Sequence, residues 1–277
     1  MKLYSSAHNG ALRLDGDSVP NCMYCESTWY TAPVREPGLF KHKSGEVLVF
    51  IGTDTENPER LNAKITLQIE NDVLTLEKTC SVFIPAGTAH GNLTVESLSK
   101  PVISYKWQPD SAYDAPDPAE AAALAGAYTN ANTVAEGYVP PSGKLPEFPE
   151  GFLSLLLFLD SERQPGAPYM ETMWMCTKND TGPATHTHED WDELIGFIGS
   201  DPDHPDELNA TVTFLLGDET ITLTKSTFIY VPRGVTHAPI LVPSLSRPII
   251  HFSQGNRGIY MKTTENADGG SITDNIY

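Results

Sequence analysis

The sequence has few basic residues, no long apolar run and few cysteines. Its 277 residues carry 18 Lys and Arg against 36 Asp and Glu, a formal net charge of −18. This balance argues against nucleic acid as a partner, because phosphates require a basic face, and against an anionic membrane surface. We therefore expect neither nucleic acid nor a membrane as partner, and attribute the acidic surface to solubility.

Apolar stretches of the length that crosses a bilayer, roughly 20 residues, are also absent. The segment Met1–Ser6 lacks the apolar core of a secretory signal, so we expect a cytoplasmic protein. The four cysteines include Cys22 and Cys25, a C-x-x-C pair. No second pair completes a zinc site, and strand alternation places the two on opposite faces, so we expect reduced cysteines without a redox or metal function.

An internal repeat organises the chain. Residues 46–54 (EVLVFIGTD) align with residues 193–201 (ELIGFIGSD), an offset of 147 positions. The same offset aligns residues 84–90 (IPAGTAH) with residues 231–237 (VPRGVTH). A register that stays constant over about 60 residues indicates a tandem duplication.

Strand patterns dominate both halves. Apolar and polar residues alternate over residues 64–67, 211–214 and 220–224, and turn residues such as 216–219 separate the short runs. Many short strands with almost no helix predict an all-β fold with one jelly-roll barrel in each half.

A connector separates the two halves. Residues 108–151 are rich in Pro, Ala, Asp and Gly. Asp117 as N-cap and Pro118 at the first helical position predict a short helix over residues 119–127. The predicted organisation is an N-terminal barrel, a linker and a C-terminal barrel, over residues 1–107, 108–151 and 152–277.

A cluster of metal-binding residue types lies in the C-terminal half. His186 and His188 are two residues apart, a spacing that points both imidazoles to one face of a strand. Glu193 opens the next apolar strand, and His237 follows 44 residues later. Three imidazoles and one carboxylate suit Fe, Mn, Ni, Cu, Co or Zn, and suit Ca or Mg poorly. Among these divalent transition metals we favour Fe or Mn. Four protein ligands on an octahedral ion leave two positions for water, dioxygen or substrate.

Asp192 competes with Glu193 for the carboxylate role. At the constant offset Glu193 stands opposite Glu46, whereas Asp192 stands opposite Gly45. The repeat therefore favours Glu193.

These segments resemble a known family. The pattern H-x-H-x4-E-x5-G over residues 186–199, with P-x-G-x2-H over residues 232–237, resembles the two cupin motifs, and the duplication makes the chain resemble a bicupin. The resemblance covers roughly residues 20–107 and 153–253. It implies two cupin barrels (double-stranded β-helices) and assigns the metal-ligand roles to the four residues named above. Leu241 replaces the asparagine often found beyond the last histidine, a position that is not a ligand.

The N-terminal half departs from the pattern. His42, Glu46 and His90 are present, but Phe40 stands where the first histidine is expected. The three remaining residues can form a two-His, one-carboxylate metal site with open positions. The alternative is a decayed site that is kept for packing and dimerisation.

His251 is the candidate catalytic residue. It shares a strand face with Ile249 and Ser253, and its counterpart in the other half is Ser104. It is a candidate general base or substrate donor; the alternative is a buried histidine bonded to backbone. Further candidates for contact with an anionic or aromatic substrate, each better suited to a surface or packing role, are Arg233, Arg247, Tyr230 and Trp191.

The resemblance alone does not fix the reaction, because bicupins include oxygenases, non-oxidative enzymes and non-catalytic binding or storage proteins. We expect a metal-dependent enzyme acting on a small organic substrate, and favour a dioxygenase-type oxidoreductase like quercetinase or gentisate dioxygenase. The first alternative is a decarboxylase, lyase or isomerase acting on a carboxylate, as in oxalate decarboxylase-like bicupins. The second is a small-ligand-binding cupin. A homodimer is expected, because cupins often pair and barrel edges otherwise stay exposed.

Overall fold

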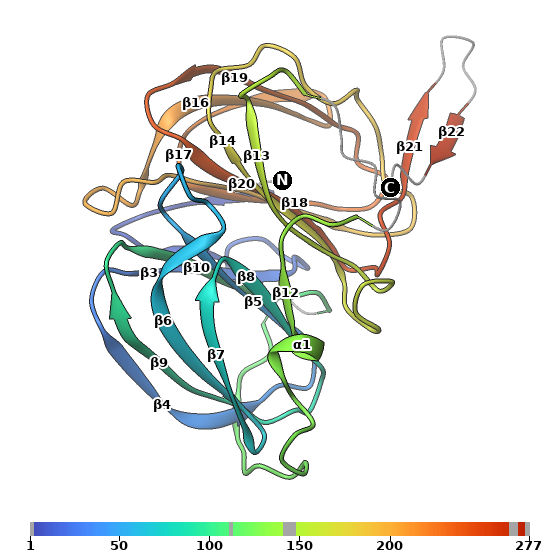
Figure 1. Cartoon of the computed structure of the whole chain (residues 1–277). Coiled ribbons are helices and arrows are strands. Elements are labelled where there is room, and N and C mark those ends of the chain that lie inside the picture. Colours follow the sequence, from blue (N-terminus) through green and yellow to red (C-terminus); the bar gives the residue numbers. More distant parts are fainter. Residues whose placement is uncertain (1–2, 111–112, 141–147, 266–270, 275–277) are drawn as a thin grey trace.

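The chain is almost entirely β-structured in the computed structural model, which describes residues 3–110, 113–140, 148–265 and 271–274. Figure 1 shows two barrels packed against each other, one coloured blue to green and one yellow to red. Within the described ranges there is a single short helix, α1 (Asn130–Thr133), and no helix that is long and apolar enough to cross a membrane. The predicted all-β fold with two jelly-roll barrels is confirmed.

Two sheets form the N-terminal barrel. The six-stranded sheet has the order β12 (Val134–Glu136), β8 (Cys80–Ile84), β5 (Glu46–Gly52), β10 (Val102–Gln108), β3 (Tyr24–Tyr30) and β2 (Leu12–Leu14). The five-stranded sheet has the order β11 (Asp117–Pro118), β4 (Val34–Lys41), β9 (His90–Leu98), β6 (Arg60–Ile69) and β7 (Asp72–Lys78). The side chains of Phe50, Ile65 and Leu67 pack between them.

The C-terminal barrel repeats this plan. Its six-stranded sheet has the order β1 (Tyr4–Ser6), β18 (Thr227–Val231), β15 (Glu193–Ile198), β20 (Ile249–Gly255), β14 (Tyr169–Met175) and β13 (Leu153–Leu159). Its three-stranded sheet has the order β17 (Glu219–Lys225), β16 (Glu207–Leu216) and β19 (His237–Leu245). A separate hairpin of β21 (Lys262–Glu265) and β22 (Ser271–Asp274) projects beside the barrel (Figure 1).

The strands β1 and β12 each pair with the barrel that they do not lead into. β1 precedes the N-terminal barrel but pairs with β18, with Tyr4 opposite Ile229. β12 precedes the C-terminal barrel but pairs with β8, with Val134 opposite Val82. The two pairings are equivalent, because Val82 and Ile229 differ by the repeat offset. Each barrel thus has a sheet edge covered by a segment that leads into the other. The division at residues 107 and 152 stays a prediction.

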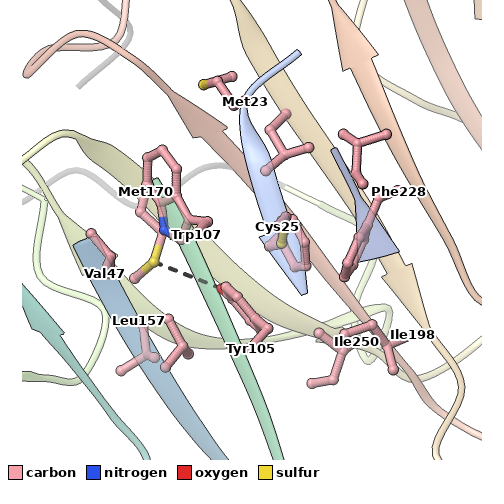
Figure 2. Packing of buried hydrophobic residues seen from close by; sticks show 14 of the residues in the cluster. Met23, Cys25, Val47, Tyr105, Trp107, Leu157, Met170, Ile198, Phe228 and Ile250 are labelled. Atoms are coloured by element: carbon pink, nitrogen blue, oxygen red, sulfur yellow. Dashed lines mark hydrogen bonds between the residues drawn. The ribbon is translucent and has the colours of Figure 1, made fainter. Parts of the chain in front are cut away.

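A shared core joins the two six-stranded sheets. Figure 2 shows Tyr105 and Trp107 of the N-terminal barrel packed beside Met170 and Ile250 of the C-terminal barrel. The Tyr105 hydroxyl donates to Met170 Sδ at 3.7 Å, and its ring stacks on Phe252 with centroids 4.4 Å apart. Burial of aromatic rings on both sides of the contact supplies much of its stabilisation.

The predicted helix over residues 119–127 is wrong. This segment is irregular, with a turn at residues 125–126, and the described helix, α1, instead begins after its N-cap Thr129. Carboxylates of the N-terminal barrel explain why no helix forms here. The carboxylate of Glu70 accepts the N–H of Ala123 at 3.0 Å, and that of Asp72 accepts the N–H of Tyr128 at 2.9 Å. Backbone donors are thus satisfied by tertiary contacts, which override a local helix start signal.

The cysteines lie in apolar surroundings. All four are free, and both Cys22 and Cys25 are buried. Burial raises the pKa of Cys22 to about 12, so this thiol stays protonated near neutral pH. A protonated, buried thiol is unreactive.

Candidate metal centre

Backbone pairing fixes the two histidines of the H-x-H segment. His186 exchanges two N–H···O bonds with His237, at 3.1 and 3.0 Å. The intervening Thr187 pairs in the same way with Thr263, just beyond the barrel. The segment is thus held between β19 and β21, which brings histidines from distant parts of the sequence together.

Each of the three imidazoles is oriented by a carbonyl group. Nδ1 of His186, His188 and His237 lies 2.7, 2.7 and 3.0 Å from the carbonyl oxygens of Ala184, Met261 and Val235. A neutral ring that donates from Nδ1 has its Nε2 lone pair free for a metal, the usual arrangement of a ligand histidine. One ring nitrogen of each lies within 4.8 Å of the other two.

Glu193 completes the cluster. Its Oε2 lies 2.9 Å from His237 Nε2 and 3.3 Å from His188 Nε2. Its Oε1 accepts a short bond of 2.5 Å from the Ser253 hydroxyl. Asp192, the rival candidate, turns away and pairs with Arg233 at 3.0 Å.

Three atoms of the cluster lack a well-aligned hydrogen bond among the described residues. These buried atoms are Nε2 of His188, Nε2 of His237 and Oε2 of Glu193. Buried polar atoms in folded proteins are rarely left without a partner, and a bound ion is one explanation. Because all three point at one another, a cation between them would satisfy each. The donor set of borderline nitrogen ligands and one carboxylate therefore fits a divalent transition metal.

Burial and neighbouring charges set the protonation states of His186 and Glu193, whereas at His237 the lowering effect of burial is outweighed by the Glu193 carboxylate, which raises the pKa. Burial, together with the neighbouring His237, lowers the pKa of His186 to about 4. Burial alone would raise the pKa of Glu193, but His188 and His237 hold it well below its usual value. His186 is therefore neutral and Glu193 ionised near neutral pH, the protonation states that metal binding requires.

A mainly apolar cavity of about 130 Å³ opens beside the cluster. Its apolar lining includes Phe152, Leu153, Met173, Met175, Ile195 and Ile240. Polar groups that also line it are Glu171, His251, Ser253, Tyr260 and Lys262. An apolar pocket with a few convergent polar groups is the usual form of a small-molecule site.

His251 lies on this cavity wall. Its ring stacks on Phe197 with centroids 4.9 Å apart, and its Nδ1 lies 3.2 Å from the Gly196 carbonyl oxygen. Burial lowers the pKa of His251 to about 4, so the ring is neutral at pH 7 and is a weaker base than free imidazole. A general-base or substrate-donor role for His251 stays a prediction, and its geometry also fits the alternative of a backbone-bonded buried histidine.

The lowered pKa of His251 has a consequence for stability. The unfolded chain takes up a proton near pH 6.5 that the folded chain takes up only near pH 4. The free energy of unfolding therefore decreases as pH falls from 6.5 toward 4, by on the order of 3 kcal/mol for this group. We expect His251→Gln to reduce the acid-induced loss, measured by urea unfolding of metal-free protein at pH 7 and pH 4.5. An equal loss in both proteins would contradict the assignment.

The N-terminal barrel holds a reduced version of the site. His90 Nε2 and His42 Nε2 lie 3.1 and 3.6 Å from the Glu46 carboxylate. Phe40 pairs with His90 as His186 pairs with His237, so it occupies the place of the first histidine. The cavity here is larger, about 290 Å³. A second metal at His42, Glu46 and His90 stays a prediction.

The remaining candidates divide between packing and the surface. Trp191 stacks on His188 with centroids 3.9 Å apart and donates from Nε1 to the Met261 carbonyl at 2.9 Å. Tyr230 is buried in the core between the barrels. Arg233 pairs with Asp192, and Arg247 lies 3.5 Å from Asp201.

Tyr260 is a site residue that the motifs do not contain. It follows the last barrel strand, lines the cavity, and places its hydroxyl 3.5 Å from His186 Nε2. The repeat carried the signal, because Tyr113 lies at the same offset of 147 and lines the cavity of the N-terminal barrel.

Comparison with solved structures shows the fold. A Bacillus subtilis oxalate decarboxylase deletion mutant matches with a TM-score of 0.59 and 11% identity, covering 94% of this chain and 78% of its own. The Lactobacillus farciminis oxalate decarboxylase formate complex matches with a TM-score of 0.55 and 13% identity, and the match covers 95% of this chain and 88% of that chain. Salicylate 1,2-dioxygenase from Pseudaminobacter salicylatoxidans matches with a TM-score of 0.52 and 10% identity, and the match covers 88% of this chain and 76% of that chain. These likenesses show that the chain has the cupin fold. No family model matches, and no curated protein matches in sequence.

Proposed function

We propose that the chain is a bicupin enzyme whose C-terminal barrel binds one divalent transition metal, Fe or Mn by preference. The ligands are His186, His188, Glu193 and His237. One observation carries the proposal: three buried imidazoles, each fixed by a backbone carbonyl, converge on an ionised carboxylate beside an apolar cavity. Donors held in place by the fold lose little freedom on binding, which favours affinity.

Dioxygenase-type oxidation of a small organic substrate is the favoured reaction. When bound to such a donor set, iron or manganese would exchange electrons with substrate and dioxygen at the positions that the protein leaves open. The residues of the chain hold the donors, exclude bulk water by the apolar cavity wall, and orient the substrate. A cavity of about 130 Å³ suits a single ring, such as a catechol or gentisate, better than a flavonol. For comparison, an apolar cavity of roughly 150 Å³ holds one benzene molecule.

Non-oxidative chemistry is the second candidate. His251 and Tyr260 both line the cavity. They offer a ring nitrogen and a hydroxyl for proton transfer, which decarboxylation, elimination or isomerisation of a carboxylate requires. The likeness to oxalate decarboxylases agrees with this reading.

Oxygen consumption separates these reactions. Metal-free protein is loaded with Fe(II), Mn(II) or Zn(II) and mixed with catechols, gentisates or flavonols. We expect oxygen uptake with Fe(II) that falls more than about 100-fold in His186→Ala and persists in His42→Ala. Release of carbon dioxide without oxygen uptake would favour the second candidate. Ligand binding without either reaction would favour a binding protein.

His251→Ala tests the role of the buried histidine in turnover. If His251 acts on the substrate, the variant should keep its metal but lose about 100-fold or more of the activity, the usual contribution of a proton-transfer group. Metal content and initial rate are measured on the same preparation. Retention of both would leave His251 as a packing residue.

A further inference from the structure

The orientation of His188 depends on residues that the cupin motifs do not specify. Its Nδ1 lies 2.7 Å from the carbonyl oxygen of Met261, which follows the last strand of the C-terminal barrel. A carbonyl oxygen only accepts hydrogen bonds, so the ring nitrogen beside it carries the proton. The lone pair of the ring is then on Nε2, which faces Glu193 at 3.3 Å. The contact with Met261 thus selects the tautomer that a ligand histidine needs.

The indole of Trp191 holds both partners of this hydrogen bond. Trp191 is 2% exposed and stacks on the His188 ring with centroids 3.9 Å apart. Its Nε1 donates to the same Met261 carbonyl at 2.9 Å. Gly255 leaves the space that the indole occupies, because a Cβ atom there would stand 2.3 Å from the Trp191 ring. One buried side chain therefore fixes the imidazole and the carbonyl relative to each other.

Backbone pairing anchors residues 261–263, here called the post-barrel segment, to the histidines. The N–H of Thr263 donates to the Thr187 carbonyl at 2.8 Å, and the N–H of Thr187 donates back at 3.0 Å. Thr187 stands between His186 and His188 in the sequence. The post-barrel segment is therefore held in register with two of the candidate ligands.

The N-terminal barrel builds the same contact from different residues. His42 Nδ1 lies 2.7 Å from the carbonyl oxygen of Asp114, which stands opposite Met261 at the repeat offset of 147. The second donor to that carbonyl is Nε2 of Gln108, at 3.3 Å, and Gln108 stands opposite Gly255. A doubly bonded carbonyl beside the second histidine is thus kept in both halves although its side-chain donor differs. This indicates a role for the anchored carbonyl beyond the packing of one indole.

Resting on the proposed function, we propose that Trp191 is a positioning residue for the metal. Together with the post-barrel segment it holds His188 in the Nδ1–H tautomer, and this sets the metal affinity of the C-terminal barrel. An imidazole that can rotate, or that carries its proton on Nε2, must reorder before it binds an ion. Loss of a partner that orients a ligand histidine usually weakens metal binding about 10- to 100-fold.

Trp191→Phe removes the indole donor and reduces the stacked area. We expect Co(II), titrated into metal-free protein and followed by its visible absorption, to bind about 10- to 100-fold more weakly than to the wild type. The absorption spectrum at saturation should also change, because it reports the ligand geometry, which a loss of stability alone does not alter. Trp174→Phe is the matched control, since Trp174 is fully buried in the core between the barrels. It should keep the affinity and the spectrum.

Thr263→Pro tests the post-barrel segment without a change at Trp191. Proline removes the N–H that Thr263 donates to Thr187, and the Co(II) affinity should fall in the same range. Ala119→Pro is the control, because it removes the N–H that Ala119 donates to the Leu39 carbonyl at 2.9 Å in the N-terminal barrel. Thermal unfolding verifies the fold of each variant.

Long-range proton–nitrogen NMR of the metal-free proteins reads the His188 tautomer directly. We expect the Nδ1–H form in the wild type and in both controls, and an increased share of Nε2–H in Trp191→Phe and Thr263→Pro. Unchanged affinity or an unchanged tautomer in either of these two variants would overturn the inference and leave the metal site standing. An equal loss of affinity in Trp174→Phe or Ala119→Pro would also overturn it. No Co(II) binding by the wild type would overturn the proposed function, and this inference with it.

Discussion

We expect His186→Ala or His237→Ala to remove most of the metal that the protein binds, and His42→Ala to leave it in place. The two C-terminal residues contribute donors to a four-residue cluster whose imidazoles are fixed by backbone carbonyls. Removing one donor leaves the others short of a partner, and the affinity should fall more than about 100-fold, beyond the usual cost of losing a supporting contact. His42 belongs to the other barrel, where Phe40 replaces one donor.

Elemental analysis of protein purified without added metal measures this effect. His42→Ala is the matched control, since Nδ1 of His42 lies 2.7 Å from the Asp114 carbonyl oxygen as that of His188 does from Met261. Thermal unfolding of each variant verifies the fold. Equal metal loss in all three variants would contradict the C-terminal barrel as the main site.

Alanine at Gly199 or at Gly52 should destabilise the protein strongly. A Cβ atom at Gly199 would stand 2.0 Å from the Glu207 carbonyl oxygen, and one at Gly52 1.9 Å from that of Arg60. These are backbone atoms of a neighbouring strand and cannot rotate away. The N–H group of each glycine is also anchored, to the Ser226 and Thr79 hydroxyls at 3.0 and 3.1 Å. Overpacking typically costs about 1–3 kcal/mol, and because backbone atoms block both positions we expect about 3 kcal/mol here.

Melting temperature is the readout for this pair. We expect each variant to melt about 6–12 °C below the wild type. Gly217→Ala is the control: its Cβ meets open space, and only its positive φ of 61° makes alanine unfavourable, at about 1 kcal/mol. If Gly199→Ala melts within a degree of Gly217→Ala, the close approach of the strands is not as described.

The repeat made much of the fold and site predictable. Its register favoured Glu193 over Asp192, and in the structure Glu193 faces the histidines while Asp192 pairs with Arg233. What escaped prediction depends on contacts between distant segments. The strand β1 has three residues, too few for alternation to show, and its partner lies 221 positions away at Ser6 and Thr227. The wrong helix over residues 119–127 followed from a local signal that the barrel carboxylates override.

Tyr260 and Lys262 show the same limit at the site. Neither belongs to a motif, and their place depends on how the chain returns to the barrel after β20, through contacts of Met261 and Thr263. The counterpart Tyr113 was visible in the sequence at the repeat offset. The repeat alone does not indicate a role for this tyrosine; that inference requires the structure, in which Tyr260 and Tyr113 each line a cavity.

The most direct test of the metal centre is a titration of metal-free wild-type protein with cobalt(II), followed by tryptophan fluorescence. Trp191 stacks on His188 at 3.9 Å, so a paramagnetic ion on that imidazole should quench its emission. We predict quenching that saturates at one equivalent and is absent in Trp191→Phe and in His186→Ala. Fluorescence that stays unchanged, or quenching that persists in Trp191→Phe, would contradict a metal site at these histidines.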